Sequence, residues 1–260
     1  MKFMIGKYAS SNSLLRRAAV VAISSAAFLL PVLPAHADSL VTNGSFETND
    51  GNGQLGYNTS ATGWSVVTPP GSYIFLFGSG TADTSGAIGQ YGNLLLWGPG
   101  SGSSNGLPAS SPDGGYFVAM DAAFQTSALT QTINGLIVGD TYAVSFYWAA
   151  SQQTCCTGQT IQNLTVSLGS ETFTTSTITL PSQGFSGWQS QTYDYTATSS
   201  SEVLSFLAAG SPAVPPFTLL DGVTLNDTTA PIPEPGTWLL LLSGLLGGVV
   251  VLKSRKWLKS

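Results

Sequence analysis

A run in the middle of the chain, in which large apolar side chains occupy every second position, most constrains its fold. The segment DTYAVSFYWAA, which begins at Asp140, places Tyr142, Val144, Phe146 and Trp148 on every second position. Successive side chains of a β-strand point to opposite faces of the sheet, so a period of two indicates a strand with one buried face. The segment therefore predicts a long β-strand in the core of the protein.

Other runs with strand character recur along the chain and are separated by clusters of Gly, Ser, Asn and Pro, which favour turns. They are YIFLF from Tyr73, GNLLLW from Gly92, GYFVAMD from Gly115, NLTVSLG from Asn163, ETFTTSTITL from Glu171, QTYDYTAT from Gln191, EVLSFLAA from Glu202 and FTLLDGVTL from Phe217. This pattern predicts an all-β fold, an antiparallel two-sheet β-sandwich or jelly roll. Residues 78–112 are expected to form a loop insertion, because GPGSGSSNGLPASSP within them is too polar and Gly-rich to pack as core.

The basic residues of the chain lie only near its two ends. They are Lys2, Lys7, Arg16, Arg17, Lys253, Arg255, Lys256 and Lys259, whereas the 13 carboxylates lie between Asp38 and Glu234 and the single histidine is His36. Without Lys, Arg or His, the middle region cannot neutralise phosphates, which excludes nucleic acid as a partner. Ser-His-Asp and Cys-His catalysis, His-ligated zinc and Lys Schiff-base chemistry are excluded for the same reason.

The N-terminal segment has the three parts of a secretory signal peptide. A basic region is followed by the apolar run AAVVAISSAAFLL and then by Ala35-His36-Ala37, in which Ala35 and Ala37 are the small residues of a cleavage site. We expect residues 1–37 to be a signal peptide and the mature chain to begin at Asp38.

The C-terminal segment has the pattern of a membrane anchor. Residues 236–252 contain no charge, and this length is at the lower limit for a helix crossing a bilayer core about 30 Å thick. The basic residues that follow should stay on the cytoplasmic side. We therefore expect a domain at 38–227, a linker at 228–235, one transmembrane helix at 236–252 and a basic cytoplasmic tip at 253–260.

The order of motifs at this end resembles a known sorting signal. Pro233, Glu234 and Pro235, followed by a Gly/Leu-rich span and a short basic terminus, resemble the PEP-CTERM sorting domain, a module also known as the ice-binding protein C-terminal domain. The resemblance implies a Gram-negative bacterium that makes exopolysaccharide, and processing of the chain by exosortase, a membrane protease-transpeptidase. It also implies anchoring in the inner membrane before processing, and the cell surface or extracellular matrix afterwards.

Three further segments resemble the galactose-binding-like jelly roll, the fold of many carbohydrate-binding modules. They are LVTNGSFET from Leu40, SPDGGYFVAMD from Ser111 with the region that follows it, and FTLLDGVTL from Phe217. This resemblance supports the fold more than any particular ligand.

Three carboxylates are candidates for a structural calcium site. Asp221 is expected to share the inward face of its strand with Leu219, Val223 and Leu225. A buried carboxylate needs hydrogen bonds or a cation, and Ca²⁺ prefers oxygen ligands. In jelly-roll modules that this chain resembles, calcium often lies where the first and last strands meet, which adds Glu47; Asp121 is a third candidate. The alternative is that Asp221 and Glu47 accept backbone N–H bonds.

Sugar binding would require exposed aromatic rings that stack on pyranose faces. The candidates beside Gly-rich turns are Trp64, Tyr91, Trp97 and Trp188, although each could instead be a packing residue. A glycosidase needs only two carboxylates. None of the acids in this chain has a recognisable catalytic context, so we expect no enzyme activity.

Both cysteines of the chain are adjacent, at Cys155 and Cys156, in the polar segment QQTCCTGQ. A vicinal disulfide, intermolecular bridges and free thiols all remain open, and we favour a vicinal disulfide that holds the loop. We expect this exported protein to bind exopolysaccharide without catalysis. The alternatives are a self-associating structural protein of the biofilm matrix and a carboxylate-dependent glycosidase.

Overall fold

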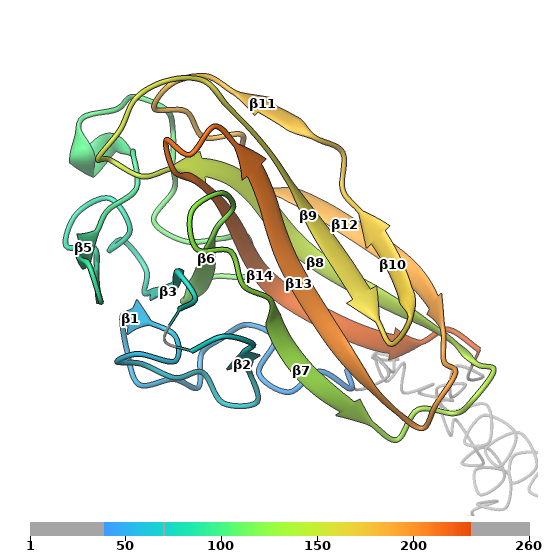
Figure 1. Ribbon diagram of the computed structural model, residues 1–260. Helices are drawn as coiled ribbons and strands as arrows, with labels where there is room; N and C mark the ends of the chain where they lie inside the picture. The colour runs from blue at the N-terminus through green and yellow to red at the C-terminus, as the bar shows by residue number, and fades with distance from the viewer. Residues whose placement is uncertain (1–38, 70, 230–260) are drawn as a thin grey trace, which may run out of the picture. The chain divides into compact units, whose positions relative to one another are not determined.

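Two antiparallel sheets pack face to face, as the alternation predicts (Figure 1). The computed structural model describes residues 39–69 and 71–229. The expected signal peptide at 1–37, the transmembrane helix at 236–252 and the basic tip lie outside this range. Within it, no helix has the length and hydropathy needed to span a membrane.

The first sheet, called the β14 sheet below, has the strand order β1-β3-β6-β14-β8-β12. Its strands are β1 (Gly53–Gln54), β3 (Ile74–Phe77), β6 (Phe117–Asp121), β8 (Thr141–Gln152), β12 (Gln189–Thr196) and β14 (Pro216–Asp227). The alternating segment from which the fold was inferred is β8, and its large side chains are buried in the core. The last strand of the domain, β14, pairs with β6 on one side and β8 on the other.

The second sheet, called the β13 sheet below, has the order β10-β9-β13-β7-β2, with β11 also paired to β9. Its strands are β2 (Ser65–Val66), β7 (Leu129–Asn134), β9 (Thr160–Leu168), β10 (Glu171–Thr174), β11 (Ile178–Leu180) and β13 (Ser201–Ser211). A separate hairpin contains β4 (Ala87–Gly89) and β5 (Gly92–Leu94), followed by the 3₁₀ turn η1 (Pro99–Ser101).

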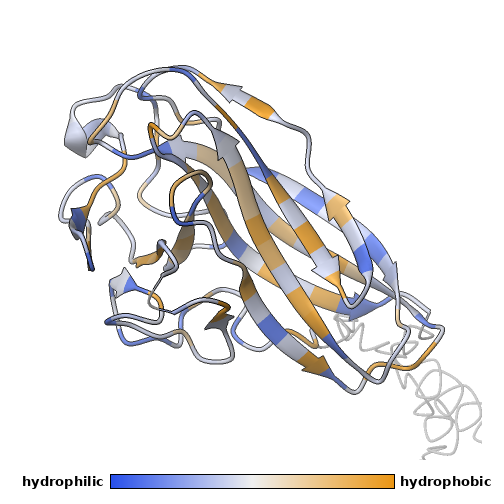
Figure 2. Ribbon diagram, viewed as in Figure 1, coloured by the Kyte–Doolittle hydropathy of each residue, from blue (hydrophilic) through white to orange (hydrophobic). Residues whose placement is uncertain are grey.

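The main core lies between the two sheets. Trp148 and Phe146 of β8 meet Phe206 of β13 there, and the rings of Phe146 and Phe206 are 5.4 Å apart. Figure 2 shows the corresponding alternation of hydrophobic and hydrophilic residues along the strands of both sheets. Burying each of these large side chains contributes roughly 1.5–3 kcal/mol, which makes the interior of the sandwich the main source of stability.

A second core covers the opposite face of the β14 sheet. Phe75, Phe117 and Phe217 lie on this face, and Leu96 and Leu107 from the insertion pack against them. The expectation that GPGSGSSNGLPASSP is too polar to pack as core is therefore wrong at Leu107. Leu96 and Leu107 anchor the insertion because both are buried, while the Gly and Ser residues form turns.

A β-bulge in β14 changes which side chains share a face. The pairing of β14 with β8 shifts between Asp221 and Thr224, where Gly222 has φ +59°. One extra residue reverses the alternation beyond it. As a result Asp221 lies on the face of Leu219 in the second core, whereas Val223 belongs to the main core. The prediction that Asp221 and Val223 share a face is wrong for this reason.

The N-terminal segment of the domain pairs with the last strand. The Leu40 N–H donates to the Leu225 carbonyl at 2.9 Å, and the Val223 N–H donates to the Gly44 carbonyl at 3.0 Å. This contact brings Glu47 close to the bulge of β14.

Candidate functional site

Four neighbouring strands of the β14 sheet present their loops at one edge. In the order β3-β6-β14-β8 the strands are antiparallel, so β3 and β14 begin where β6 and β8 end. The segments at these ends come together at the upper left of Figure 1, where the β4–β5 hairpin also lies. Loops that are distant in sequence therefore line one pocket.

This pocket, called the aromatic pocket below, has a volume of about 340 Å³. Its lining residues are Tyr73, Tyr91, Phe124, Gln153, Cys156, Ala213 and Pro215. Small-molecule sites commonly measure roughly 300–1,000 Å³, so the aromatic pocket can hold a small ligand or the end of a longer one.

Three aromatic rings meet at the aromatic pocket. Tyr73 is only 5% exposed, whereas Tyr91 and Phe124 are 61% and 59% exposed. The ring of Tyr73 lies 5.8 Å from Tyr91 and 6.4 Å from Phe124, and the two exposed rings are 6.0 Å apart. The buried ring therefore supports two others that face solvent.

Asp121 holds the turn that presents Phe124. One carboxylate oxygen accepts the N–H groups of Ala123 at 2.9 Å and Phe124 at 3.0 Å, and the other accepts the Gln125 N–H at 3.3 Å. Asp121 pairs with Phe217, four residues before Asp221 on β14, which is about 13 Å at about 3.3 Å per residue. The expectation that Asp121 joins Glu47 and Asp221 at a calcium site is therefore wrong, because it lies too far away and its oxygens bind backbone.

Side-chain amides fix the position of Tyr91. The Gln125 amide donates to the Tyr91 hydroxyl at 2.8 Å, and the Gln90 amide donates to Gln125 at 2.7 Å. Burial raises the pKa of Tyr73, and the neighbouring Asp121 and Tyr91 raise it further. The Tyr73 hydroxyl therefore stays protonated at neutral pH and can donate a hydrogen bond.

The four predicted stacking residues have different positions in the structure. Tyr91 lines the aromatic pocket. Trp97 is partly buried, and its indole N–H donates to the Cys156 carbonyl at 2.9 Å behind the same pocket. Trp188 is partly buried against Phe117 in the second core, with ring centres 5.6 Å apart. The sequence did not single out Tyr73, Phe124 or Gln153 for this site, because they come from separate strand ends.

Trp64 belongs to the main core. It is 8% exposed, its ring lies 5.1 Å from that of Phe46, and its N–H donates to the Asn43 carbonyl at 2.9 Å. The expectation that Trp64 offers a free face for sugar stacking is wrong, because Phe46 and Phe206 pack around its ring.

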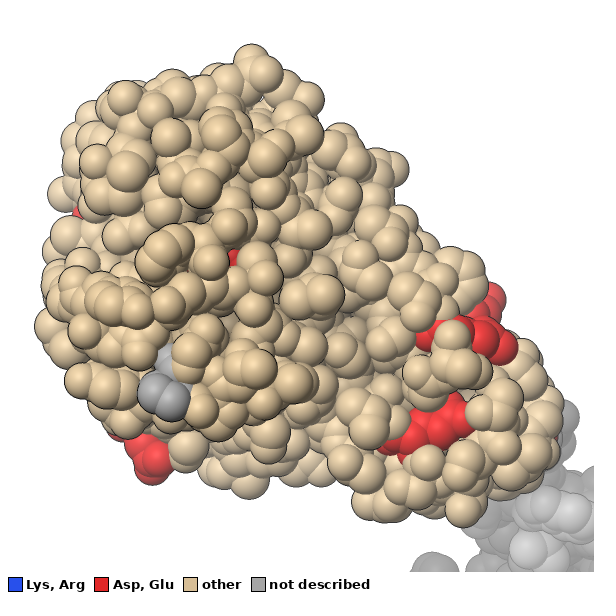
Figure 3. Space-filling view, in the orientation of Figure 1, with Lys and Arg blue, Asp and Glu red and all other residues tan. Residues whose placement is uncertain are grey.

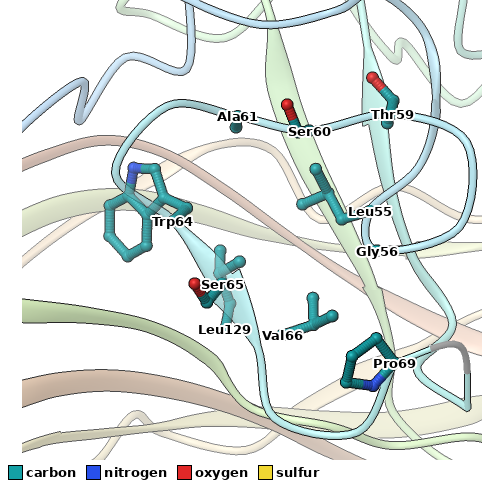
Figure 4. Close-up of a pocket in the computed structure, with 10 residues that line it drawn as sticks. All are labelled: Leu55, Gly56, Thr59, Ser60, Ala61, Trp64, Ser65, Val66, Pro69 and Leu129. Atoms are coloured by element: carbon teal, nitrogen blue, oxygen red, sulfur yellow. The ribbon is translucent and has the colours of Figure 1, made fainter.

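Trp64 also lines a second pocket of about 250 Å³, which Figure 4 shows. The other lining residues are Leu55, Gly56, Thr59, Ser60, Ala61, Ser65, Val66, Pro69 and Leu129. Apart from the indole N–H of Trp64, which is bonded to the Asn43 carbonyl, the polar side-chain groups among these residues are hydroxyls. The aromatic pocket, with exposed rings and amides together, is better suited to orient a polar ligand.

The surroundings of Asp221 differ from those of Asp121. Asp221 is fully buried, and the Ser111 hydroxyl donates to its Oδ2, whereas its Oδ1 has no hydrogen-bond partner. Burial raises the pKa of Asp221 to about 8. The Ser111 and Gly222 hydrogen bonds lower it, and the charges of Asp113 and Glu47 raise it. Without a cation, this carboxyl is mostly protonated at neutral pH.

The cysteines form a disulfide between Cys155 and Cys156 in the loop after β8. Cys155 is exposed and Cys156 is partly buried in the wall of the aromatic pocket. The loop is fixed to the insertion, because the Thr154 N–H donates to the Leu95 carbonyl at 2.9 Å.

Comparison with known protein families supplies information about the C-terminal segment. Residues 231–256 match the PEP-CTERM protein-sorting motif. The chain carries a PEP-CTERM sorting signal. The match includes the predicted motif of Pro233, Glu234 and Pro235, and it indicates an exported protein that an exosortase processes. No curated protein matches the PEP-CTERM chain in sequence.

Several solved structures are similar to the domain that precedes this sorting motif. TmCBM61, solved in complex with β-1,4-galactotriose, is 14% identical, with a TM-score of 0.42, and the match covers 74% of this chain and 99% of that one. A CBM4 structure is 19% identical over 72% of this chain and 99% of its own, with a TM-score of 0.34. The CBM22-1 xylan-binding domain from Paenibacillus barcinonensis is 10% identical over 76% and 100%, with a TM-score of 0.35.

Proposed function

We propose that this exported protein binds extracellular polysaccharide through the aromatic pocket, without catalysing a reaction. The observation that carries the proposal is the pair of exposed rings, Tyr91 and Phe124, held beside a cavity of about 340 Å³. Both are fixed from behind, Tyr91 by the Gln125 amide and Phe124 by the turn that Asp121 caps.

Rigid, exposed aromatic rings suit the recognition of sugars. A pyranose ring has an apolar face that can stack on an aromatic ring, while its hydroxyls bond to amides and phenols. Tyr91 and Phe124 supply the rings, and Tyr73 and Gln153 supply polar groups in the same pocket. Because these residues are already held in place, binding would require little ordering of side chains.

The charge of the domain favours neutral glycans over acidic ones. The sequence has no Lys, Arg or His between Asp38 and Leu252, and the aromatic pocket is lined by uncharged residues. In Figure 3 the charged atoms visible on the described part of the chain are all carboxylates. An anionic polysaccharide would find no cation to pair with and would be repelled.

We therefore expect soluble β-1,4-galactan or xylan to bind more tightly than polygalacturonate. Isothermal titration calorimetry with the purified full-length protein would measure this difference. Binding to the neutral polymers should change little between low and high salt, because the contacts are uncharged. Tighter binding to polygalacturonate, or no binding to any neutral polysaccharide of a broad panel, would contradict the proposal.

A catalytic role receives no support from the aromatic pocket. A glycosidase needs a carboxyl group that protonates the leaving oxygen and a second carboxylate. Asp121, the acid beside the pocket, accepts backbone N–H bonds with both oxygens. Release of reducing ends from the bound polysaccharide by the full-length protein would show that this conclusion is wrong.

The outer face of the β13 sheet favours one alternative function, which is self-association. Strand pairing places only uncharged residues of β7, β13 and β9 on this face: Thr130, Thr132, Asn134, Val203, Ser205, Leu207, Ile161, Asn163, Thr165 and Ser167. Since the domain has no cations, two copies would meet with least repulsion through such a face.

If this face joins two copies, Leu207→Glu should convert a dimer into a monomer. The introduced carboxylates would face each other across the contact, and sedimentation velocity over a range of concentrations would measure the change. Ile137→Glu is the matched control, because Ile137 is exposed in the β7–β8 turn and lies outside this face. A wild-type protein that stays monomeric at high concentration would exclude the alternative.

A structural calcium ion remains part of the proposal. Asp221 Oδ1 is buried without a partner, and the charge of Glu47 acts on the same carboxyl. These two residues would be its carboxylate ligands, and they lie where the N-terminal segment meets the last strand. Within residues 39–69 and 71–229, however, no three acidic, Cys or His side chains form a ready-made metal site.

A further inference from the structure

We propose that the Cys155–Cys156 disulfide positions the wall of the aromatic pocket, and that its reduction weakens polysaccharide binding there. This inference rests on the proposed function of the aromatic pocket. The disulfide is close to the exposed rings, since Cys156 lines the pocket with Tyr91 and Phe124.

The position of the disulfide in the chain rules out an ordinary stabilising role. A disulfide stabilises a fold mainly by closing a loop between residues that are distant in sequence. This one joins adjacent residues and therefore closes no such loop. Neither cysteine belongs to the hydrophobic clusters of the described residues, and Cys155 is exposed. Its effect must therefore be local, within the loop that carries it.

Hydrogen bonds hold the loop on both sides of the disulfide. Before it, the Gln152 amide donates to the carbonyls of Val214 at 3.0 Å and Gly158 at 3.2 Å. After it, the Gly158 N–H donates to the Ser182 hydroxyl at 2.9 Å. These bonds fix the ends of the loop and leave the backbone between them to be set by the residues inside it.

Trp97 connects the disulfide to the rest of the wall. Its indole N–H donates to the Cys156 carbonyl at 2.9 Å, and its backbone N–H donates to the Gln152 carbonyl at 2.9 Å. The covalent bond between the two side chains restricts the backbone of Cys155 and Cys156, so that Cys156 can accept the Trp97 hydrogen bond through its carbonyl while it lines the pocket. With two free thiols this restriction is lost, and the wall opposite Tyr91 and Phe124 can adopt other conformations.

Reduction of the Cys155–Cys156 disulfide requires only a dithiol reductant. A dithiol reductant supplies two electrons and two protons, the Cys155–Cys156 bond breaks to give two thiols, and the reductant closes to a cyclic disulfide. The chain has only these two cysteines, so a reductant acts at this one bond.

The test compares polysaccharide binding by the oxidised and reduced full-length protein. Calorimetry with β-1,4-galactan and xylan would be performed before and after dithiothreitol treatment, with intact mass confirming each redox state. We expect the dissociation constant to rise at least about fivefold on reduction and in the combined Cys155→Ser, Cys156→Ser variant. By linkage, bound polysaccharide should shift the thiol–disulfide equilibrium toward the disulfide by the same factor. A purely structural disulfide would not show this reciprocal effect.

Thr157→Ala is the matched control, because Thr157 is exposed in the same loop and does not line the pocket. Equal affinity of oxidised and reduced protein would overturn the inference and leave the proposed function intact. A fall in melting temperature of more than about 4 °C on reduction would show general stabilisation and also overturn it. If the oxidised wild type binds no polysaccharide, the proposed function fails, and the role of the disulfide fails with it.

Discussion

The Asp221→Asn variant is expected to be more stable than the wild type at pH 8 and about equal to it at pH 4. The carboxyl of Asp221 is fully buried, and its pKa is raised to about 8. Between its usual value near 3.8 and about 8, the folded protein binds this proton and the unfolded chain does not. Stability therefore falls as the pH rises through this window and is fully present below it.

The expected size of this effect is several kcal/mol. One pKa unit corresponds to about 1.4 kcal/mol, so a shift of about four units gives an upper limit of roughly 5 kcal/mol across the window. An amide at position 221 carries no charge at any of these pH values. The variant should therefore lose most of the pH dependence between pH 4 and 8, measured by urea unfolding at each pH in the presence of a chelator.

Asp194→Asn is the control, because Asp194 is an exposed carboxylate on β12. It should keep the pH dependence of the wild type. A wild type whose stability does not fall between pH 4 and 8 would contradict the prediction. Added Ca²⁺ distinguishes a calcium ion bound at Asp221 from a carboxyl that is protonated and binds no ion. If the ion binds Asp221 and Glu47, it should raise the melting temperature of the wild type and leave that of Asp221→Asn unchanged.

Replacing either exposed ring of the aromatic pocket should abolish most polysaccharide binding. Tyr91→Ala and Phe124→Ala each remove a stacking surface, and truncation of a central aromatic contact commonly costs about 2 kcal/mol or more, which is roughly a 30-fold loss of affinity. Both rings are more than half exposed, so folding stability should change by less than about 1 kcal/mol. Calorimetry with β-1,4-galactan and xylan, together with thermal melts, would measure both effects.

Phe173→Ala provides the comparison for these variants. Phe173 is 40% exposed on β10, where its ring stacks on Tyr193 at 5.0 Å, and it does not line the pocket. Its removal should leave affinity unchanged. Wild-type affinity in both pocket variants would show that any binding occurs elsewhere on the domain.

The strands were predictable because their signal is local. The alternation in β8 requires only that one face of the strand be buried, and the structure confirms it. The bulge at Gly222 was not predictable, because the sequence FTLLDGVTL alternates through it without interruption. The register shift arises from pairing of β14 with β8 and from the contact of Val223 with Gly44. The burial of Leu107 was missed for a similar reason, since it depends on the phenylalanines of distant strands.

The aromatic pocket was predictable only in part. Tyr91 stood out because it is an aromatic residue beside a Gly-rich turn. Tyr73 and Phe124 have no local signal of function, and they reach the same pocket because β3 begins where β6 ends. The turn capped by Asp121 shows the same limit. The short spacing from Asp121 to Phe124 and Gln125 allows the carboxylate to accept their N–H groups, but nothing in the sequence distinguishes this role from that of a metal ligand.

The central place of β14 has a consequence for the time at which the domain can fold. This strand is the last in the sequence, yet it lies between β6 and β8, and the N-terminal segment pairs with it. The second core, which includes Phe217 and Leu219 of β14, cannot form until residues 216–227 have been synthesised and exported. The sorting signal begins only a few residues later, at 231. Completion of the fold is thereby tied to the arrival of the segment that the processing enzyme reads, and a chain cut short before β14 would reach the exterior without a folded domain.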